Sequence, residues 1–350
     1  MTNKRTVSKL MGAATIAAAT LCAGGVASAA ETMPTVTLMV GGIDKQIYLE
    51  YQLAESLGMY KKYGVNVELS TEQAGGVGAE DALLSGQVNM AGAWYNHTIE
   101  LQEKGKNLIG VVQLAVAPGE RIMCAKGTSV TSPTDWKGKS VGVTDLGSGT
   151  DALVSFVSAR AGLKPADYTK IAAGAGQTMI AALKFGKAVC GITSQPTVNA
   201  IEKLDVGYSA IDLSTGAGVQ KWLGGEYPAA SVLAYADWVA AHKKETQAVV
   251  NALVATLAWM KTHTPADVAA VMPADFVSNP LTSKDEYIAA LKADWGQFNL
   301  DRLGIMPENG PQTVFDIEKA AGKITGTANL ATTYTNDFVT SAKKTLGLAN

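Results

Sequence analysis

The sequence predicts an α/β protein built from two related lobes. Segments typical of strands and helices alternate from residue 36 to about residue 235, and the chain is mostly helical after that point. Such alternation indicates a largely parallel sheet that helices cover on both faces. A short internal repeat supports two related lobes. In it, Gly76, Ala82, Leu83 and Gly86 recur at the same spacing as Gly176, Ala182, Leu183 and Gly186.

The alternating part of the chain divides into short elements bounded by glycine turns. Residues 36–40 alternate as a strand before the Gly41-Gly42 turn, and residues 48–62 have the apolar spacing of an amphipathic helix. Residues 140–143 form a strand that leads into a glycine loop and the helix 151–161. The other expected elements are the strands 65–69, 88–91, 108–114 and 188–192 and the helix 79–85.

The C-terminal third carries clear signals for the starts of helices. Thr264 caps a helix whose first residue is Pro265, and Ser283 with Glu286 has the spacing of a capping box. Residues 247–260 have apolar side chains at helical spacing, and core packing alone explains that stripe.

The first 29 residues have the pattern of a cleaved export signal. A basic start precedes the Ala-rich apolar run 10–26, and residues 27–29 form a small-x-small cleavage site. The run is too short, and too rich in Ala, Gly and Thr, for a membrane-spanning helix. We therefore expect export to the periplasm, with cleavage near Ala29 and a mature chain that starts at Ala30. The alternatives are a buried N-terminal helix and a lipid anchor on Cys22, whose preceding residues match the lipidation pattern poorly.

Size and charge exclude several classes of function. Removing 29 of the 350 residues leaves 321, which suits two domains. Without the three cations of the signal, the chain holds 26 of its 29 basic residues against 31 acidic ones, a formal charge of −5. Nothing in it resembles a footprint for nucleic acid. Because the three histidines lie far apart in sequence and no HxxxH or CxxC motif occurs, we expect no metal site. We also expect no cofactor. We expect Cys124 and Cys190 to be free, buried thiols, with a single disulfide as the alternative.

Three sequence motifs occur in a recognisable order. They are AESLGMYKKYGVNV at 54–67, ALLSGQVNMA at 82–91 and TDWKGKSVGV at 134–143. This set resembles the periplasmic substrate-binding proteins of ABC importers, in the branch that binds nitrate, sulfonates, taurine and thiamin-precursor pyrimidines. Asn89 stands where the family usually has an aspartate, and Val189 holds the corresponding place in the second lobe. Since that aspartate is mostly structural, the expected fold does not change.

The resemblance implies the type II periplasmic-binding-protein fold, in which two α/β lobes joined by two crossing segments hold a ligand in the cleft between them. Carried onto this chain, lobe one comprises residues 30–118 and 229–350, and lobe two comprises residues 119–228. The crossings lie near 118–126 and 224–230. The resemblance also implies a monomer that captures a small molecule and delivers it to an inner-membrane permease.

Candidate ligand-binding residues lie where loops open onto helix N-termini, because free N–H groups and the helix dipole favour anions there. For the glycine loops the alternative is ordinary turn chemistry, and no Lys-Ser/Thr follows the lobe-one loop to make it a nucleotide P-loop. The candidates are Gly147, Ser148, Gly149 and Thr150 in lobe two, Gly75 and Gly76 in lobe one, Gly42 and Lys45 after the first strand, the cleft-wall pair Trp94 and Tyr95, Gln195 after a lobe-two strand, and Tyr227 at the return crossing.

The leading hypothesis is binding without chemistry, of a sulfonate, a taurine-like compound, nitrate or an aromatic acid. A neutral thiamin-precursor pyrimidine is the alternative ligand. The second class is an enzyme, since that branch includes pyrimidine synthases, but those carry a cysteine-rich iron-binding motif that this chain lacks. No GxSxG or HExxH hydrolase motif is present either. The effector domain of a transcription regulator shares the architecture, and it would need an N-terminal helix-turn-helix in place of the signal.

Overall fold

The computed structural model describes residues 33–72 and 75–348. The predicted signal peptide, its cleavage site and the alternative anchor at Cys22 lie outside these residues. Every helix of the described part is too short or too polar to span a membrane.

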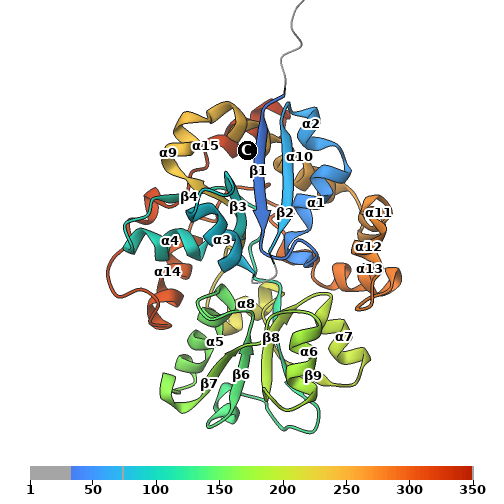
Figure 1. Cartoon of the computed structure of the whole chain (residues 1–350), viewed down its shortest axis with the longest axis vertical. Coiled ribbons are helices and arrows are strands. Elements are labelled where there is room, and N and C mark those ends of the chain that lie inside the picture. Colours follow the sequence, from blue (N-terminus) through green and yellow to red (C-terminus); the bar gives the residue numbers. More distant parts are fainter. Residues whose placement is uncertain (1–32, 73–74, 349–350) are drawn as a thin grey trace, which may run out of the picture. The chain divides into compact units, whose positions relative to one another are not determined.

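Two five-stranded sheets form the framework of the described chain (Figure 1). Sheet one has the strand order β2-β1-β3-β10-β4, and sheet two repeats that pattern as β7-β6-β8-β5-β9. In both sheets the first three strands are parallel, and the fourth is antiparallel to its two neighbours. The strands of sheet one are β1 (Thr35–Val40), β2 (Asn66–Thr71), β3 (Met90–Trp94), β4 (Leu108–Gln113) and β10 (Ala230–Tyr235). Those of sheet two are β5 (Glu120–Ala125), β6 (Ser140–Val143), β7 (Thr169–Ala172), β8 (Cys190–Ser194) and β9 (Gly207–Asp212).

The antiparallel strand of each sheet is supplied by the chain as it crosses from the other sheet. β5 follows β4, and β10 returns to sheet one after α8 (Gly216–Trp222). We use lobe one and lobe two for the parts of the chain built on sheets one and two. This arrangement confirms the predicted α/β architecture of two lobes. The division into 30–118 with 229–350 and 119–228 stays a prediction.

Helices cover both faces of each sheet. Along β1, Leu38 points into a core shared with α1 (Leu49–Ser56) and α10 (Lys243–Thr262), and Met39 points toward α3 (Gly76–Leu84) and α4 (Asn96–Glu103). In sheet two, Ile122 of β5 faces the core that holds α5 (Gly149–Arg160), and Met123 faces α6 (Gln177–Lys184) and α7 (Thr197–Lys203). Burial of these apolar side chains, at about 25 cal/mol per Å² removed from water, is the main force that holds helices on sheets.

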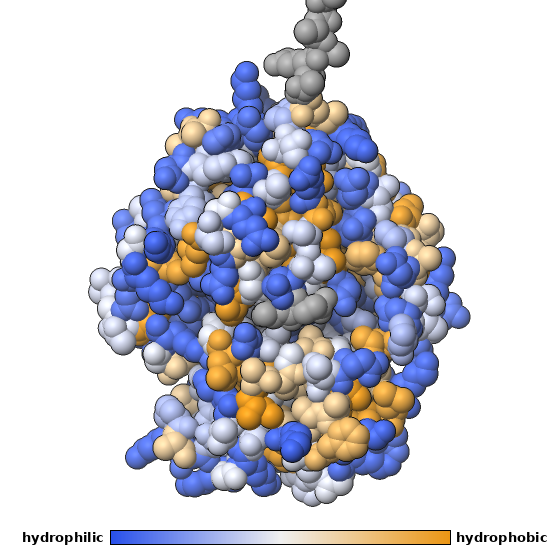
Figure 2. All heavy atoms as spheres, in the orientation of Figure 1, coloured by the Kyte–Doolittle hydropathy of each residue, from blue (hydrophilic) through white to orange (hydrophobic). Residues whose placement is uncertain are grey.

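The remaining helices belong mostly to the C-terminal part. α10 packs against α15 (Asp337–Thr345), and α14 (Gly310–Ala320) packs against both α4 and α5, so it contacts both lobes. The others are α2 (Met59–Lys62), α9 (Ala236–Ala241), α11 (Pro265–Val271), α12 (Ala274–Val277) and α13 (Lys284–Ala293). On the face shown in Figure 2, hydrophilic residues are widespread and hydrophobic residues form smaller groups between them.

Most predicted elements are present, with shifted ends. The strand 140–143 has its predicted bounds, and the predicted cap at Thr264 and the predicted capping box of Ser283 with Glu286 are confirmed. The helix predicted over 48–62 is divided, because Gly58 adopts a left-handed conformation (φ +66°) between α1 and α2. The strand predicted to end at residue 91 extends to Trp94. That extension carries the Trp94 side chain to the edge of the sheet.

Asn89 performs the structural role expected at its position. Its Oδ1 accepts hydrogen bonds from the N–H and the hydroxyl of Thr37, both at 3.0 Å. These bonds fix the segment just before β3 to β1. The repeated unit is also structural, since Gly76 begins α3 and Gly176 caps α6 in the corresponding place of lobe two.

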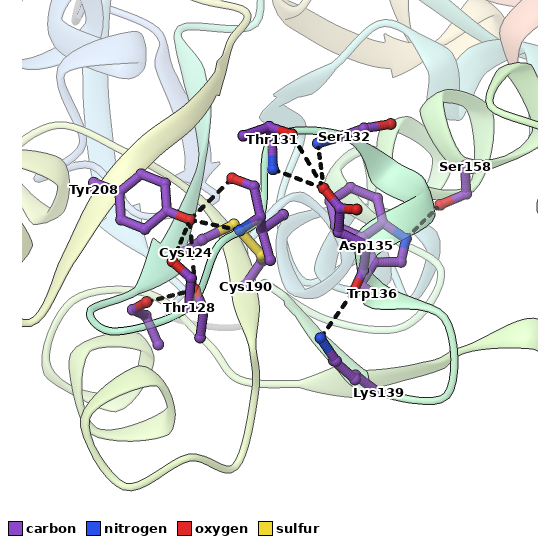
Figure 3. The surroundings of a disulfide bond; sticks show 12 residues. Cys124, Thr128, Thr131, Ser132, Asp135, Trp136, Lys139, Ser158, Cys190 and Tyr208 are labelled. Carbon is purple, nitrogen blue, oxygen red and sulfur yellow. Dashed lines mark hydrogen bonds between the residues drawn. A yellow bond between two sulfur atoms is a disulfide. The ribbon is translucent and has the colours of Figure 1, made fainter.

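The expectation of two free thiols is wrong, because Cys124 and Cys190 form a disulfide in sheet two (Figure 3). The antiparallel register of β5 and β8 places Cys124 directly opposite Cys190, with the Cα atoms 3.9 Å apart. The two residues are 66 positions apart in sequence, and they meet only because the crossing strand β5 pairs with β8. Both are buried, as predicted, but they are not separate.

Candidate ligand-binding cleft

A narrow cleft, partly open to solvent, has walls from both lobes. Lobe one contributes the segment after β1, the start of α3 and the end of β3. Lobe two contributes the first residue of β5, the loop after β6 and the start of α5. The lining residues are Lys45, Ile47, Tyr48, Gly75, Gly76, Trp94, His97, Glu120, Thr144, Ser148, Gly149 and Thr150.

The lobe-two wall is a helix N-terminus whose hydroxyl groups are already hydrogen-bonded to one another. Ser148 Oγ donates to the carbonyl of Asp145 at 2.7 Å. Ser148 Oγ also lies 2.8 Å from Thr150 Oγ1, and because the Ser148 proton is already used, Thr150 is the donor between these two hydroxyls. Thr150 Oγ1 in turn accepts a hydrogen bond from the N–H of Thr144 at 3.0 Å. Both hydroxyl protons are therefore used inside the loop. The first N–H groups of α5, those of Gly149 and Thr150, have no acceptor within the helix and are the donors available to a ligand.

Asp151 strengthens this helix start and connects it to lobe one. Its buried carboxylate forms ion pairs with Lys170 of lobe two and with Lys323, which follows α14. Burial alone would raise the pKa of Asp151, but hydrogen bonds from Lys170, Lys323 and the N–H of Gly147 outweigh it and lower the pKa. A carboxylate in the first turn also complements the helix dipole.

Trp94 of lobe one lies directly against the start of α5. A Cβ atom added to Gly149 would stand 2.1 Å from Trp94 Cε3, so only glycine fits at this contact. Tyr227 packs edge-on against Trp94, with ring centroids 5.8 Å apart. The Tyr227 hydroxyl donates to Glu318 Oε1 at 3.3 Å. Trp94 is thus held between the two lobes at one side of the cleft.

Lys45 provides a cation to the lobe-one wall. Its half-buried side chain passes over Gly42, where an added Cβ would lie 2.7 Å from Lys45 Cε, and its Nζ donates to the Gly41 carbonyl at 3.0 Å. Burial lowers the pKa of Lys45, while the nearby carboxylates of Glu120 and Asp44 oppose that shift.

His97 lies beside the start of α3. Its Nε2 would be 2.8 Å from a Cβ on Gly76, and its Nδ1 is in contact with the carboxylate of Glu80. Burial disfavours the charged imidazole, but the charge and hydrogen bond of Glu80 outweigh burial and raise the pKa of His97.

Glu120, the first residue of β5, is the acidic group of the cleft. Its side chain is buried, and its Oε2 has no hydrogen-bond partner among the residues that the structure describes. Burial raises the pKa of Glu120 to about 8; Asp294 adds to this shift, while Lys45 and Arg121 oppose it. The guanidinium of Arg121 is itself bound by both carboxylate oxygens of Asp294, at 3.0 and 2.6 Å.

Seven of the twelve predicted ligand-binding residues line this cleft. Gly42 and Gly147 lie next to it, since Gly42 supports the Lys45 side chain and Gly147 donates to Asp151. The residues that line it are Lys45, Gly75, Gly76, Trp94, Ser148, Gly149 and Thr150.

Three predicted residues point elsewhere. The hydroxyl of Tyr95 is bonded to Thr333 inside lobe one, and the Gln195 amide donates to Asn199 at 3.0 Å. Tyr227 lies behind Trp94 rather than on the cleft surface.

Sequence reasoning missed Ile47, Tyr48, His97, Glu120 and Thr144. Thr144 directly follows a predicted strand, so the rule that selected the neighbouring loop also points to it. Tyr48 is the first residue of the predicted helix 48–62 and Ile47 directly precedes it, and neither carries a separate signal. Ligand binding by any of these residues, predicted or missed, stays a prediction.

Residues 48–266 match the family model described as NMT1/THI5 like. The chain belongs to this family. No curated protein sequence matches the chain significantly.

Solved structures confirm the periplasmic-binding-protein fold. A protein from Bordetella bronchiseptica RB50 is 27% identical, with a TM-score of 0.81 over 89% of this chain and 98% of that one. The periplasmic nitrate-binding protein NrtA from Synechocystis PCC 6803 has a TM-score of 0.71 at 14% identity, over 90% and 89% of the two chains. The alkanesulfonate-binding protein SsuA from Xanthomonas axonopodis pv. citri, bound to MOPS, has a TM-score of 0.67 at 16% identity, over 87% and 98%.

The same fold also occurs in an enzyme. The desulfurization enzyme DSZB has a TM-score of 0.59 at 13% identity, over 89% of this chain and 99% of that one. The fold alone therefore does not distinguish a binding protein from an enzyme, because function depends on the residues of the cleft.

Proposed function

We propose that this protein is the extracytoplasmic solute-binding component of an ABC importer. It captures a small molecule between its lobes, and the closed form delivers that molecule to a membrane permease. Family membership, the nitrate- and sulfonate-binding proteins that share the fold and a cleft with walls from both lobes support this function. A ligand that contacts both lobes favours their closed arrangement by its differential affinity for it.

We also propose that the protein acts in the periplasm as a monomer, after cleavage near Ala29 and Ala30. The basic, apolar and small-residue pattern of the first 29 residues supports this localisation. Mass spectrometry of the periplasmic protein should find a chain that begins at Ala30. An intact N-terminus on cytoplasmic protein would contradict export, and a lipid on Cys22 would replace soluble export with anchoring.

The ligand is a small anion: a sulfonate, a taurine-like compound, nitrate or an aromatic acid. One observation carries this choice. The start of α5, with the free N–H groups of Gly149 and Thr150, and the ammonium of Lys45 line the same cleft from opposite lobes. Hydrogen bonds to a charged group contribute about 1.5–3 kcal/mol each, so two or three of them suffice for reversible capture.

A neutral pyrimidine is the second candidate ligand. The aromatic rings of Trp94 and Tyr48 and the carboxyl of Glu120, with its pKa of about 8, give the cleft groups that stack on a ring and exchange hydrogen bonds with it. We do not propose an enzyme, because the cysteine-rich motif of the pyrimidine synthases, the enzyme class that the resemblance brings in, is missing from this sequence.

A thermal-shift screen tests the proposal, since a bound ligand raises apparent stability by mass action. The panel contains nitrate, alkanesulfonates, taurine, aromatic acids and aminopyrimidines. We expect at least one anion to raise the unfolding temperature, and calorimetry should show that Lys45→Met weakens its binding. The matched control is Lys106→Met at an exposed position, which should bind as the parent does. Stabilisation by a pyrimidine and by no anion would overturn the anion assignment in favour of the second candidate.

A further inference from the structure

We propose that Glu120 selects a second functional group of the ligand, and that the ligand is amphoteric: an organic anion that also carries a basic N–H group. This inference rests on the proposed function and narrows the ligand class within it. The group on Glu120 is an ammonium or a similar nitrogen base, and the acidic group of the same molecule lies at the start of α5.

The burial of Glu120 is the first observation. The residue is only 4% exposed, it lines the cleft, and its Oε2 has no hydrogen-bond partner among the described residues. Buried polar groups in folded proteins are nearly always hydrogen-bonded, because burial without a partner is unfavourable. A hydrogen-bond donor of the ligand can supply the partner that this carboxyl oxygen lacks.

The neighbouring cations do not supply the missing donor. Both terminal nitrogens of the Arg121 guanidinium bond to Asp294, and its Nε lies 3.4 Å from Asp212. Lys45 Nζ donates to the Gly41 carbonyl, and within the described chain it makes no ion pair with Glu120 at 4.0 Å or less. Glu120, which lines the cleft, is therefore left without a donor for its Oε2 among the described residues.

The cleft thus presents two chemically opposite surfaces. The N–H groups of Gly149 and Thr150 and the ammonium of Lys45 attract an acid, and Glu120 attracts a base. A simple anion such as nitrate satisfies only the first surface and leaves Glu120 without a partner. An aminoalkanesulfonate or a short amino acid satisfies both surfaces.

The protonation of Glu120 gives this inference a signature of its own. The charged and titratable groups around it are Lys45, Tyr48, Arg121 and Asp294. Because its pKa lies at about 8 in the ligand-free protein, the carboxyl is mostly protonated at pH 7. An ammonium bound beside it lowers that pKa and releases the proton. Binding of the amino ligand should therefore release protons at Glu120, and binding of a plain anion should not.

The experiment compares 3-aminopropanesulfonate with propanesulfonate, and 3-aminopropanol serves as an amine without an acid. Calorimetry in buffers of different ionisation enthalpy gives both affinity and proton release. We expect the parent protein to prefer the aminosulfonate by about tenfold or more, since one hydrogen bond to a charged group is worth at least that factor. Glu120→Gln should lose the preference and the proton release while it still binds propanesulfonate. Glu226→Gln, at an exposed pair with Arg302, is the matched control and should change neither.

Each outcome decides between the proposals. Equal affinity for both sulfonates in the parent protein, or a preference that survives in Glu120→Gln, overturns the role of Glu120 and leaves the anion-binding function intact. Binding of 3-aminopropanol without either sulfonate overturns the amphoteric ligand and leaves Glu120 as a base-binding group. Failure of all three compounds to bind overturns the amphoteric ligand as well. In both cases the thermal-shift screen, which also contains nitrate and aromatic acids, decides the anion-binding function. Proton release by the parent protein requires no variant, so a folding defect in Glu120→Gln does not remove the test.

Discussion

The contact between Gly149 and Trp94 is the sharpest place to perturb this molecule. A Cβ at position 149 would stand 2.1 Å from Trp94 Cε3, whereas ordinary contact begins at 3.4 Å, so Gly149→Ala forces a separation of about 1.3 Å. Overpacking of this kind costs about 1–3 kcal/mol. If that energy opposes only the closed arrangement, the dissociation constant of the ligand rises by about 5- to 150-fold. Alanine favours helices more than glycine does, so lobe two itself should stay folded.

Calorimetry on the best ligand of the screen measures the effect, with thermal unfolding as the check on the fold. Gly216→Ala is the matched control, because it also lies at the first position of a helix and an added Cβ there meets nothing within 4 Å. Trp94→Leu in the Gly149→Ala background makes room for the new methyl group. The two substitutions should therefore be strongly non-additive. Unchanged affinity in Gly149→Ala, or an equal loss in Gly216→Ala, would refute the claim that this contact controls closure.

Three further predictions concern stability. Thiol counting on unreduced, denatured mature protein, which lacks Cys22, should find no free cysteine, and a count of two would contradict the bond. Reduction of Cys124–Cys190 should lower the free energy of unfolding by about 2–5 kcal/mol. Asp294→Ala leaves the Arg121 guanidinium without its bidentate partner and should lower the free energy of unfolding in denaturant by about 3–5 kcal/mol. A loss below about 1 kcal/mol would show that this ion pair contributes little to stability. Burial raises the pKa of Glu120 to about 8, so its contribution to stability is complete below its unfolded pKa and is lost as pH rises through about 8. Glu120→Gln should therefore make the unfolding temperature fall less steeply across that pH window. An unchanged slope would contradict burial of the carboxyl.

Local signals in the sequence predicted much of the fold. The Ser283 hydroxyl oxygen accepts a hydrogen bond from the N–H of Glu286, and the Glu286 carboxylate accepts one from the N–H of Ser283, as the spacing of the two residues indicates. The strand 140–143 and the helix after it are separated by a loop with Gly147 and Gly149, which marks the boundary between the two elements in the sequence. Such features depend on residues within one or two turns of each other, so no knowledge of the fold is needed to find them.

Features that depend on distant parts of the chain escaped prediction. Cys124 and Cys190 face each other because a strand that crosses from lobe one pairs with β8, and nothing near either residue reports that pairing. Tyr95 follows Trp94 directly in sequence, but its side chain points into lobe one, where Thr333 binds its hydroxyl. Adjacent positions at the end of a strand lie on opposite sides, so the two aromatics could not both line the cleft.

Glu120 was missed because the rule used to find site residues applies to parallel strands. In a parallel sheet, loops that follow the carboxyl ends of strands gather at one edge, and ligands bind there. β5 is antiparallel to β8, and its first residue, Glu120, pairs with Ser194 at the carboxyl end of β8. For an antiparallel crossing strand, the residue that reaches the ligand edge is therefore the one that begins it. The same reasoning applies to β10, whose first residue pairs with Trp94. Of these two first residues, Glu120 lines the cleft, whereas Ala230 of β10 is buried beside the lining residue Trp94. A charged side chain at the start of β5 is thus placed to contact whatever the two lobes enclose.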